Sequence, residues 1–297
     1  MKIKKNAFTL VEMVFVIVVL GIVAVIGSSI IAKIYESYIY SRSVNELQTK
    51  TELALTQISK YLSFRVKNSI IARKPSGKFV SLSDADGSYK ILEWIGYNNE
   101  GFEGNGTDPG WSGFVDLDSP ETNQTQIKTS GSQLSLAEQN IYALSNGEVN
   151  LSDPSQSSDP NSSAAIIFDG LPNDFNVSHY GWYNSGDHDY VFKVKRSGSD
   201  VLKFIENKPK TVYEHYKLTW SAYALVPNPL GGSDVNLTMY YNFRPWMDEN
   251  YTDGNSSVLI EHVTTFKFLQ KGDTIRLKLC IKNPKVNDIF CKEKVVF

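Results

Sequence analysis

Glu12 is the residue whose type and position most clearly suggest a chemical role. It lies in the apolar series Phe8–Val14 and directly precedes the uncharged run Met13–Ala32. Moving an unpaired carboxylate into a bilayer costs about 3 kcal/mol on insertion scales, so a charge in such a run usually has a partner and a function. We therefore predict an ionic contact for Glu12. The alternative is a side chain that simply reaches the membrane interface.

The sequence lacks the usual patterns of catalytic sites. It contains no H-E-x-x-H, no G-x-S-x-G and no phosphate-binding glycine loop. His188 has acidic neighbours at Asp187 and Asp189, but adjacent residues of a strand point to opposite faces. A polar loop is favoured there over a metal site. The sequence predicts that the protein is not an enzyme and has no cofactor.

Two acidic turns keep calcium open as an alternative. Asp84 and Asp86 match half of a calcium-binding loop but lack the third acidic position and the correctly spaced glutamate. Asp248 and Asp253 form a second acidic turn before Gly254. At both places we favour an ordinary solvated turn over a calcium site.

The amino terminus carries the signals of a membrane anchor. Lys2, Lys4 and Lys5 precede the apolar run. As a helix, Met13–Ala32 spans roughly 30 Å, the thickness of a bilayer core. Because positive residues stay on the cytoplasmic side, the amino end is expected in the cytoplasm and the rest of the chain outside. The run is longer than the apolar part of a cleaved signal peptide, so we predict one membrane-anchored helix.

A lysine-rich leader, a small residue, the series Phe-Thr-Leu-Val-Glu and an apolar run together resemble the type IV prepilin family, which includes the type II secretion pseudopilins. The resemblance implies that a prepilin peptidase cuts between Ala7 and Phe8 and methylates the new amino group of Phe8. Glu12 then becomes the fifth residue of the mature chain. Most members have glycine before the cut, where this sequence has alanine.

The chemistry agrees with this resemblance. Cleavage leaves a cationic amino group on Phe8, and Glu12 lies one helical turn away. Its carboxylate can pair with that amine on a neighbouring subunit. In a low-dielectric setting, removing one partner leaves a buried charge at a cost of about 3–5 kcal/mol. Glu12 is therefore predicted to be an assembly residue.

The helix is expected to continue past the membrane, from about Phe8 to Asn68, with a firm stop at Pro75. Apolar or small residues recur at helical spacing and predict a face that packs on a sheet; they are Val44, Leu47, Thr51, Ala54, Ile58 and Tyr61. An exposed coiled-coil stalk is the alternative. The predicted divisions are a leader at 1–7, a transmembrane helix half at 8–32, an amphipathic helix half at 33–74 and a globular β-rich domain at 75–297.

The globular part reads as short strands separated by loops. The expected strands are Phe79–Leu82, Lys90–Tyr97, Ala164–Phe168, Tyr190–Val194, Lys203–Ile205, Val212–Val226, Val235–Phe243, Val258–Leu269 and Thr274–Ile281. Residues 96–163 are rich in Gly, Asn, Ser and Thr and predict a loop-rich insertion, partly packed through Trp111, Phe114 and Tyr142, with a mobile centre around 145–163. The predicted fold class is α+β, with the long helix packed on an antiparallel sheet.

Cys280 and Cys291 flank Pro284 and a polar turn, which suggests a hairpin closed by a disulfide. The prepilin resemblance supports this, since the family often carries one near its C-terminus. Direct pairing places Lys278 opposite Glu293 but also Leu277 opposite Lys294, so the register stays open. Two free buried thiols are the alternative.

The chain has 297 residues, 41% of them hydrophobic, and a formal net charge of −2. It is long enough for a proper core but gives no electrostatic argument for binding duplex nucleic acid. Aromatic runs at Tyr180–Tyr183 and Tyr240–Trp246 have the chemistry to stack on DNA bases or a glycan. Packing in the core is favoured for them.

The resemblance implies a structural filament subunit, a minor pilin or pseudopilin that initiates or caps a filament for secretion, pilus assembly or DNA uptake. The closing segments Leu259–Phe266 and Thr274–Ile281 loosely resemble large J-type pseudopilins. Implied partners are other pilin subunits, prepilin peptidase and the inner-membrane assembly platform. The implied location is the bacterial inner membrane, in a single pass, with the domain in the periplasm, and after assembly a periplasmic or surface filament. The alternative function is a membrane-anchored ligand-binding or adhesin-like domain.

Overall fold

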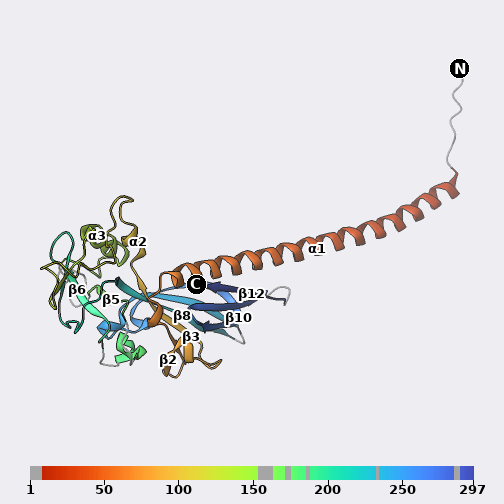
Figure 1. Cartoon of the computed structure of the whole chain (residues 1–297). Coiled ribbons are helices and arrows are strands. Elements are labelled where there is room, and N and C mark those ends of the chain that lie inside the picture. Colours follow the sequence, from red (N-terminus) through yellow and green to blue (C-terminus); the bar gives the residue numbers. More distant parts are fainter. Residues whose placement is uncertain (1–8, 153–162, 171–174, 185–187, 232–233, 284–287) are drawn as a thin grey trace, which may run out of the picture.

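A computed structural model describes residues 9–152, 163–170, 175–184, 188–231, 234–283 and 288–297. One long helix, α1 (Leu10–Ser63), runs out of a β-rich domain (Figure 1). With 54 residues at 1.5 Å each it is about 80 Å long. The α+β class predicted from the sequence is confirmed.

The second half of α1 packs on the sheet through the predicted face. Thr51, Ala54 and Ile58 are buried, and Leu47 and Tyr61 are partly buried against the same core. Leu55 and Leu62, which the sequence pattern missed, are fully buried beside them. This contact excludes the exposed-stalk alternative for residues 51–62.

The helix ends earlier than the sequence predicts. Residues 67–69 form a 3-10 turn, and strand β1 (Ile71–Arg73) lies in the interval assigned to the amphipathic helix half, 33–74. The Arg65 guanidinium donates hydrogen bonds to the carbonyl oxygens of Leu62 and Asp273, at 2.8 Å each, which joins the end of the helix to the sheet. The apolar residues Ile70–Ala72 then enter the core as extended chain.

The strands that follow are β2 (Phe79–Ser81), β3 (Ile91–Tyr97), β4 (Gln126–Lys128), β5 (Ala165–Phe168), β6 (Phe192–Arg196), β7 (Val201–Phe204), β8 (Tyr216–Gly231), β9 (Asp234–Phe243), β10 (Asn255–Lys271), β11 (Thr274–Lys282) and β12 (Ile289–Val296). Their pairing is antiparallel, in the order β12-β11-β10-β9-β8-β5-β6-β7-β4. β3 pairs with β8 and β1, and β1 also pairs with β2. Every strand expected from the sequence has a counterpart. The three-residue strands β1 and β4 were missed, and β12 was implied only by the hairpin suggested at Cys280 and Cys291.

The sheet carries a core on each face. One core lies under α1 and includes Leu225 and Leu277. The other lies on the opposite face and includes Ala222, Ala224 and Trp246. Because both faces are covered, the polar residues Thr219 and Ser221 of β8 are buried as well.

The insertion at 96–163 is better packed than its composition suggests. It contains α2 (Asn99–Glu103), β4 and α3 (Leu134–Leu144), and it helps to build a third core around Trp111. Trp111 is buried as expected, but Phe114 and Tyr142 are exposed. Val149 and Leu151, in the stretch expected to be mobile, are fully buried, and residues 153–162 lie outside the described part.

The predicted disulfide joins Cys280 of β11 to Cys291 of β12. The two residues are directly opposite in the ladder, with Lys278 opposite Glu293 and Leu277 opposite Lys294. Lys278 and Glu293 form an ion pair at 2.8 Å. In the chain-entropy treatment, closing a loop of this size contributes about 3 kcal/mol to the free energy of unfolding.

Candidate assembly site

Glu12 closes the first turn of α1. The Thr9 hydroxyl accepts from the Glu12 backbone N–H at 3.4 Å, and Glu12 Oε2 accepts from the Thr9 backbone N–H at 3.1 Å. Oε2 also accepts from the Thr9 hydroxyl at 3.0 Å. This reciprocal arrangement is a capping box, which satisfies backbone donors that a helix start leaves without partners.

The capping box lowers the cost of placing Glu12 near lipid. Both of its bonds to Thr9 end on Oε2, so Oε1 keeps its capacity to accept from a second partner. Glu12 is exposed in the first turn of α1, and this end of the helix lies away from the domain (Figure 1). The Glu12 carboxylate is therefore oriented by Thr9 through Oε2, while Oε1 can accept a hydrogen bond from another molecule.

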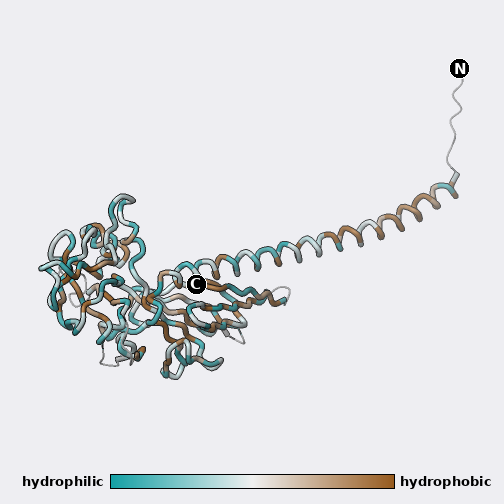
Figure 2. Tube along the Cα trace, in the orientation of Figure 1, coloured by the Kyte–Doolittle hydropathy of each residue, from teal (hydrophilic) through white to brown (hydrophobic). Residues whose placement is uncertain are grey.

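The first half of α1 is an unpartnered apolar rod. Figure 2 shows hydrophobic residues along it and hydrophilic residues toward the domain. Its large apolar side chains are exposed, as with Leu10, Phe15 and Ile31 at 82, 71 and 69%. Among the described residues, α1 is the helix that is long and apolar enough to cross a membrane. Ala7 and Phe8, the predicted processing residues, lie outside the described part together with the leader.

Ion pairs connect the second half of α1 to the last strand, β12. The Glu52 carboxylate pairs with Lys292 and, at 3.6 Å, with Lys294, both on β12. The two lysines lower the pKa of Glu52. Since these groups are exposed, the pairs orient the helix more than they stabilise it.

In the two candidate calcium turns, at residues 84–88 and 248–254, the carboxylates contact nearby residues of the chain. Asp86 accepts hydrogen bonds from the Ser88 hydroxyl and, at 2.7 Å, from the Ser88 backbone N–H, and these two bonds lower the pKa of Asp86. Asp253 accepts from the Asn250 N–H at 2.9 Å, which caps its own turn. Asp84 accepts from the Ser83 hydroxyl at 3.4 Å, and Asp248 lies 4.0 Å from His188 Nε2. No group of three or more His, Cys, Asp or Glu that could hold a metal ion occurs within the described ranges.

A buried arginine beside the second acidic turn was not predicted. Arg244, with a side chain only 4% exposed, donates to Glu249 Oε1 from Nε at 3.1 Å and from Nη2 at 2.9 Å. It also lies 3.3 Å from Glu148 Oε2, and Asn242 accepts from it at 3.2 Å. This network joins the insertion to the end of β9. The one signal in the sequence was Glu249, which follows Arg244 by five residues in the second acidic turn.

A buried carboxylate was missed as well. Glu93, in the middle of β3, is fully buried, and the Tyr183 hydroxyl lies 2.5 and 2.6 Å from its two oxygens. The Arg73 guanidinium lies 4.1 Å from the centre of the Tyr183 ring. Burial raises the pKa of Glu93 to about 7, although Tyr183 and Arg73 act in the opposite direction. The acidic residue within the apolar series Ile91–Ile95 was the signal for this site.

Glu93 makes the stability of the domain depend on pH. Its folded pKa, about 7, is above the ordinary value of 4.5. The folded chain therefore holds a proton that the unfolded chain releases, and the free energy of unfolding falls as pH rises through this range by about 3 kcal/mol. Urea unfolding of the detergent-solubilised chain, followed by tryptophan fluorescence, measures this against Glu93→Gln. We expect the two curves to diverge between pH 4.5 and 7 and to run parallel above 7; curves parallel throughout contradict the expectation.

Three of the histidines contact different neighbours. His262 Nδ1 lies 3.4 Å from Asp234 Oδ2, and the His215 ring lies 6.0 Å from that of Phe114. His179 packs on the Tyr190 ring at 4.9 Å. Of the aromatic runs, Tyr180, Trp182 and Trp246 are buried in the core, as the packing interpretation predicts.

A comparison with protein families identifies the N-terminal segment. The family model described as the prokaryotic N-terminal methylation motif matches residues 2–28. Searches of curated proteins and of solved structures gave no match to the chain. The matched segment contains Ala7, Phe8 and Glu12 and the start of the exposed apolar helix. A motif of this kind is processed by prepilin peptidase and leads to assembly in pilin filaments. The chain carries, at its N-terminus, the prepilin motif of the type IV pilins and pseudopilins.

Proposed function

We propose that the protein is a large minor pilin or pseudopilin that initiates or caps a filament in protein secretion, pilus biogenesis or DNA uptake. The observation that carries the proposal is α1: its first half is apolar and exposed and carries the motif, while its second half is fixed in a large domain. A rod with one free apolar half suits a protein that leaves the bilayer for a bundle of similar helices. The role at an end of the filament rests on size, because repeated major subunits of this family are smaller.

Assembly would proceed through the first turn of α1. Removal of residues 1–7 exposes the amino group of Phe8, and Glu12 Oε1 has capacity to accept from it on a neighbouring subunit. Thr9 holds the carboxylate through Oε2 in the meantime. Pairing the two charges away from water sets the register between subunits. The expected partners are prepilin peptidase, other pilin subunits and the assembly platform of the membrane.

The proposed location follows from charge and from the disulfide. Lysines before the apolar run favour a cytoplasmic amino end and a domain on the other side. A disulfide such as Cys280–Cys291 persists in oxidising compartments, which fits a periplasmic domain. The loose likeness to J-type pseudopilins supports the type II secretion version of the proposal.

The amino terminus is the first thing to measure, by mass spectrometry on protein from native membranes. We expect a chain that begins with N-methylated Phe8. An Ala7→Gly variant is a matched control, because glycine is the common residue at this position in the family, and it should yield the same terminus. An intact Met1, or a cut beyond residue 26, would instead indicate an anchored or secreted domain and overturn the proposal.

A further inference from the structure

The first half of β10 is an open edge of the sheet. β10 pairs with β9 from Asn255 to Val263, and within the described residues it pairs with β11 only from Val263 to Lys271. In that part of the chain, residues 255–262 therefore have a neighbouring strand on one side only. Successive residues of a strand direct their main-chain groups alternately to its two sides, so about half of the N–H and C=O groups of this segment point to the open side.

A groove runs along this open edge, between β10 and α1. Its volume is about 610 Å³, within the usual range for binding sites. It is lined by the consecutive run Val258–His262 of β10, by residues of α1 between Ser43 and Gln57, and by Ile281–Asn283 at the end of β11. Side chains of successive strand residues point to opposite faces of a sheet. Five consecutive lining residues therefore show that the groove is bordered by the edge of β10 and not by one of its faces.

The beginning of this edge lacks the features that usually prevent strand pairing. Natural edges are protected by charged side chains, by proline or by bulges. Residues 255–258, Asn-Ser-Ser-Val, contain neither charge nor proline, and they pair with residues 241–238 of β9 without a bulge. All four are exposed, and the irregularities of β10 begin only after Val258. The segment is thus held extended by β9 and is accessible to another strand.

The walls of the groove favour a polypeptide as its occupant. Leu53 of α1 and Val258 of β10 face solvent from the two walls, with exposed fractions of 63 and 50%. The lining carries as many acidic as basic residues, namely Glu46 and Glu261 against Lys50 and Lys282. A polyanion gains little from such a neutral surface. An added strand supplies the row of main-chain donors and acceptors that an open edge requires, and its apolar side chains can contact Leu53 and Val258.

We propose that an extended segment of a neighbouring pilin subunit adds a strand to β10 at residues 255–261. The inference rests on the proposed filament function and assigns to the domain a contact of its own. The groove follows α1 from Ser43 to Gln57, beyond the apolar half that would enter the helix bundle. A subunit packed beside α1 in the filament is therefore placed next to the open edge. In this arrangement Glu12 sets the register of the helices, and β10 holds the neighbouring domain.

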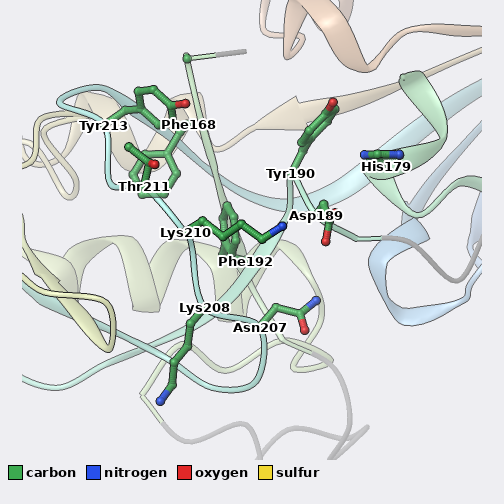
Figure 3. Close-up of a pocket in the computed structure, with 11 residues that line it drawn as sticks. Phe168, His179, Asp189, Tyr190, Phe192, Asn207, Lys208, Lys210, Thr211 and Tyr213 are labelled. Carbon is green, nitrogen blue, oxygen red and sulfur yellow. The ribbon is translucent and has the colours of Figure 1, made fainter. Parts of the chain in front are cut away.

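A second cleft, between β5, β6 and the segment that leads into β8, gives no comparable argument (Figure 3). Its volume is about 370 Å³. Lys210 extends toward Asp189 and away from the Tyr213 ring, so its ammonium group already faces a carboxylate. The charge of this cleft is matched within the chain and does not indicate a particular ligand.

Hydrogen–deuterium exchange followed by mass spectrometry tests for the main-chain bonds themselves. Sheared filaments that contain the chain are compared with the full chain in detergent. We expect about half of the amides of residues 255–261 to exchange at least tenfold more slowly in filaments, because those on the open side gain an acceptor. Residues 264–271, already paired with β11, are the internal reference and should exchange alike in both samples. Unchanged exchange at 255–261 overturns the proposal. The same protection in detergent at high protein concentration also overturns it, because a second copy of this chain would then be the occupant.

Substitutions on the two walls provide an independent test. Val258→Lys places a charge on the edge, and Leu53→Lys narrows the groove from α1 without altering the strand. Each should lower incorporation into filaments at least tenfold. Leu269→Lys is the matched control, because Leu269 is an apolar residue of the same strand, 54% exposed, that does not line the groove. It should be incorporated normally, and circular dichroism shows whether each variant is folded.

The outcomes separate this inference from the proposed function. Normal incorporation of Val258→Lys and Leu53→Lys, or an equal loss in Leu269→Lys, overturns strand addition while the unmodified chain is still found in filaments. Absence of the unmodified chain from filaments overturns the proposed function, and this inference with it.

Discussion

Replacing Glu12 by alanine is expected to leave the globular domain folded and to reduce incorporation into filaments by at least tenfold. The variant loses the acceptor for the Phe8 amine, and the amine is left unpaired in a setting with little water, at a cost of about 3–5 kcal/mol. The domain should not change, because the side-chain hydrogen bonds of Glu12 in the described part of the chain all go to Thr9, at the start of α1. The measurement is the ratio of the variant in sheared filaments to that in membranes, by immunoblot.

Glu36→Ala provides the matched control for this prediction. Glu36 is an exposed glutamate of the same helix, beyond the apolar run. Its loss should leave incorporation unchanged. Normal incorporation of Glu12→Ala would falsify the role proposed for Glu12, and an equal defect in both variants would point to a general effect of charge on the helix.

Replacing Arg244 by methionine is expected to lower the free energy of unfolding by about 3–5 kcal/mol, because it leaves Glu249 and Glu148 without their buried cation. Methionine keeps a similar length of apolar chain, so the loss reports mainly on charge and hydrogen bonds. Urea unfolding followed by tryptophan fluorescence measures it, with Trp246 close in sequence as a reporter.

Arg276→Met is the control, since Arg276 is exposed on β11 and should change stability by no more than about 0.5 kcal/mol. If Arg244→Met costs no more than this control, the network around Arg244 contributes no net stability. The structure would then require another explanation for an arginine buried at this point.

The helix and most strands could be predicted because their patterns are local. The apolar run, the helical spacing from Val44 to Tyr61 and the alternation in Thr274–Ile281 each appear within a few residues. The disulfide could be predicted for the same reason, because its two cysteines flank one turn. Its register, with Leu277 opposite Lys294, looked unfavourable only because the sequence did not show that Lys294 turns toward Glu52 on α1.

What the sequence could not show depends on distant contacts. The early end of α1 is set by Arg65, which bonds to Asp273 across 208 residues of chain. Glu93 meets Tyr183 across 90 residues, and Arg244 meets Glu148 across 96. The polar-looking insertion packs because Trp111 finds partners such as Tyr216, at a centroid distance of 5.7 Å. In each of these places an unusual residue was visible, while its partner was not.

The Arg65 contact has a mechanical consequence. Its guanidinium donates to Leu62 at the end of α1, to Asp273 in the turn before β11 and, at 3.1 Å, to the Phe297 carbonyl oxygen after β12. The disulfide fixes β12 to β11 in addition. A force applied along α1 therefore acts on the end of the helix, the turn before β11 and the end of β12 at the same time. These three segments bear the load together through Arg65, so tension passes from the helix to the sheet without detaching the outermost strand, β12.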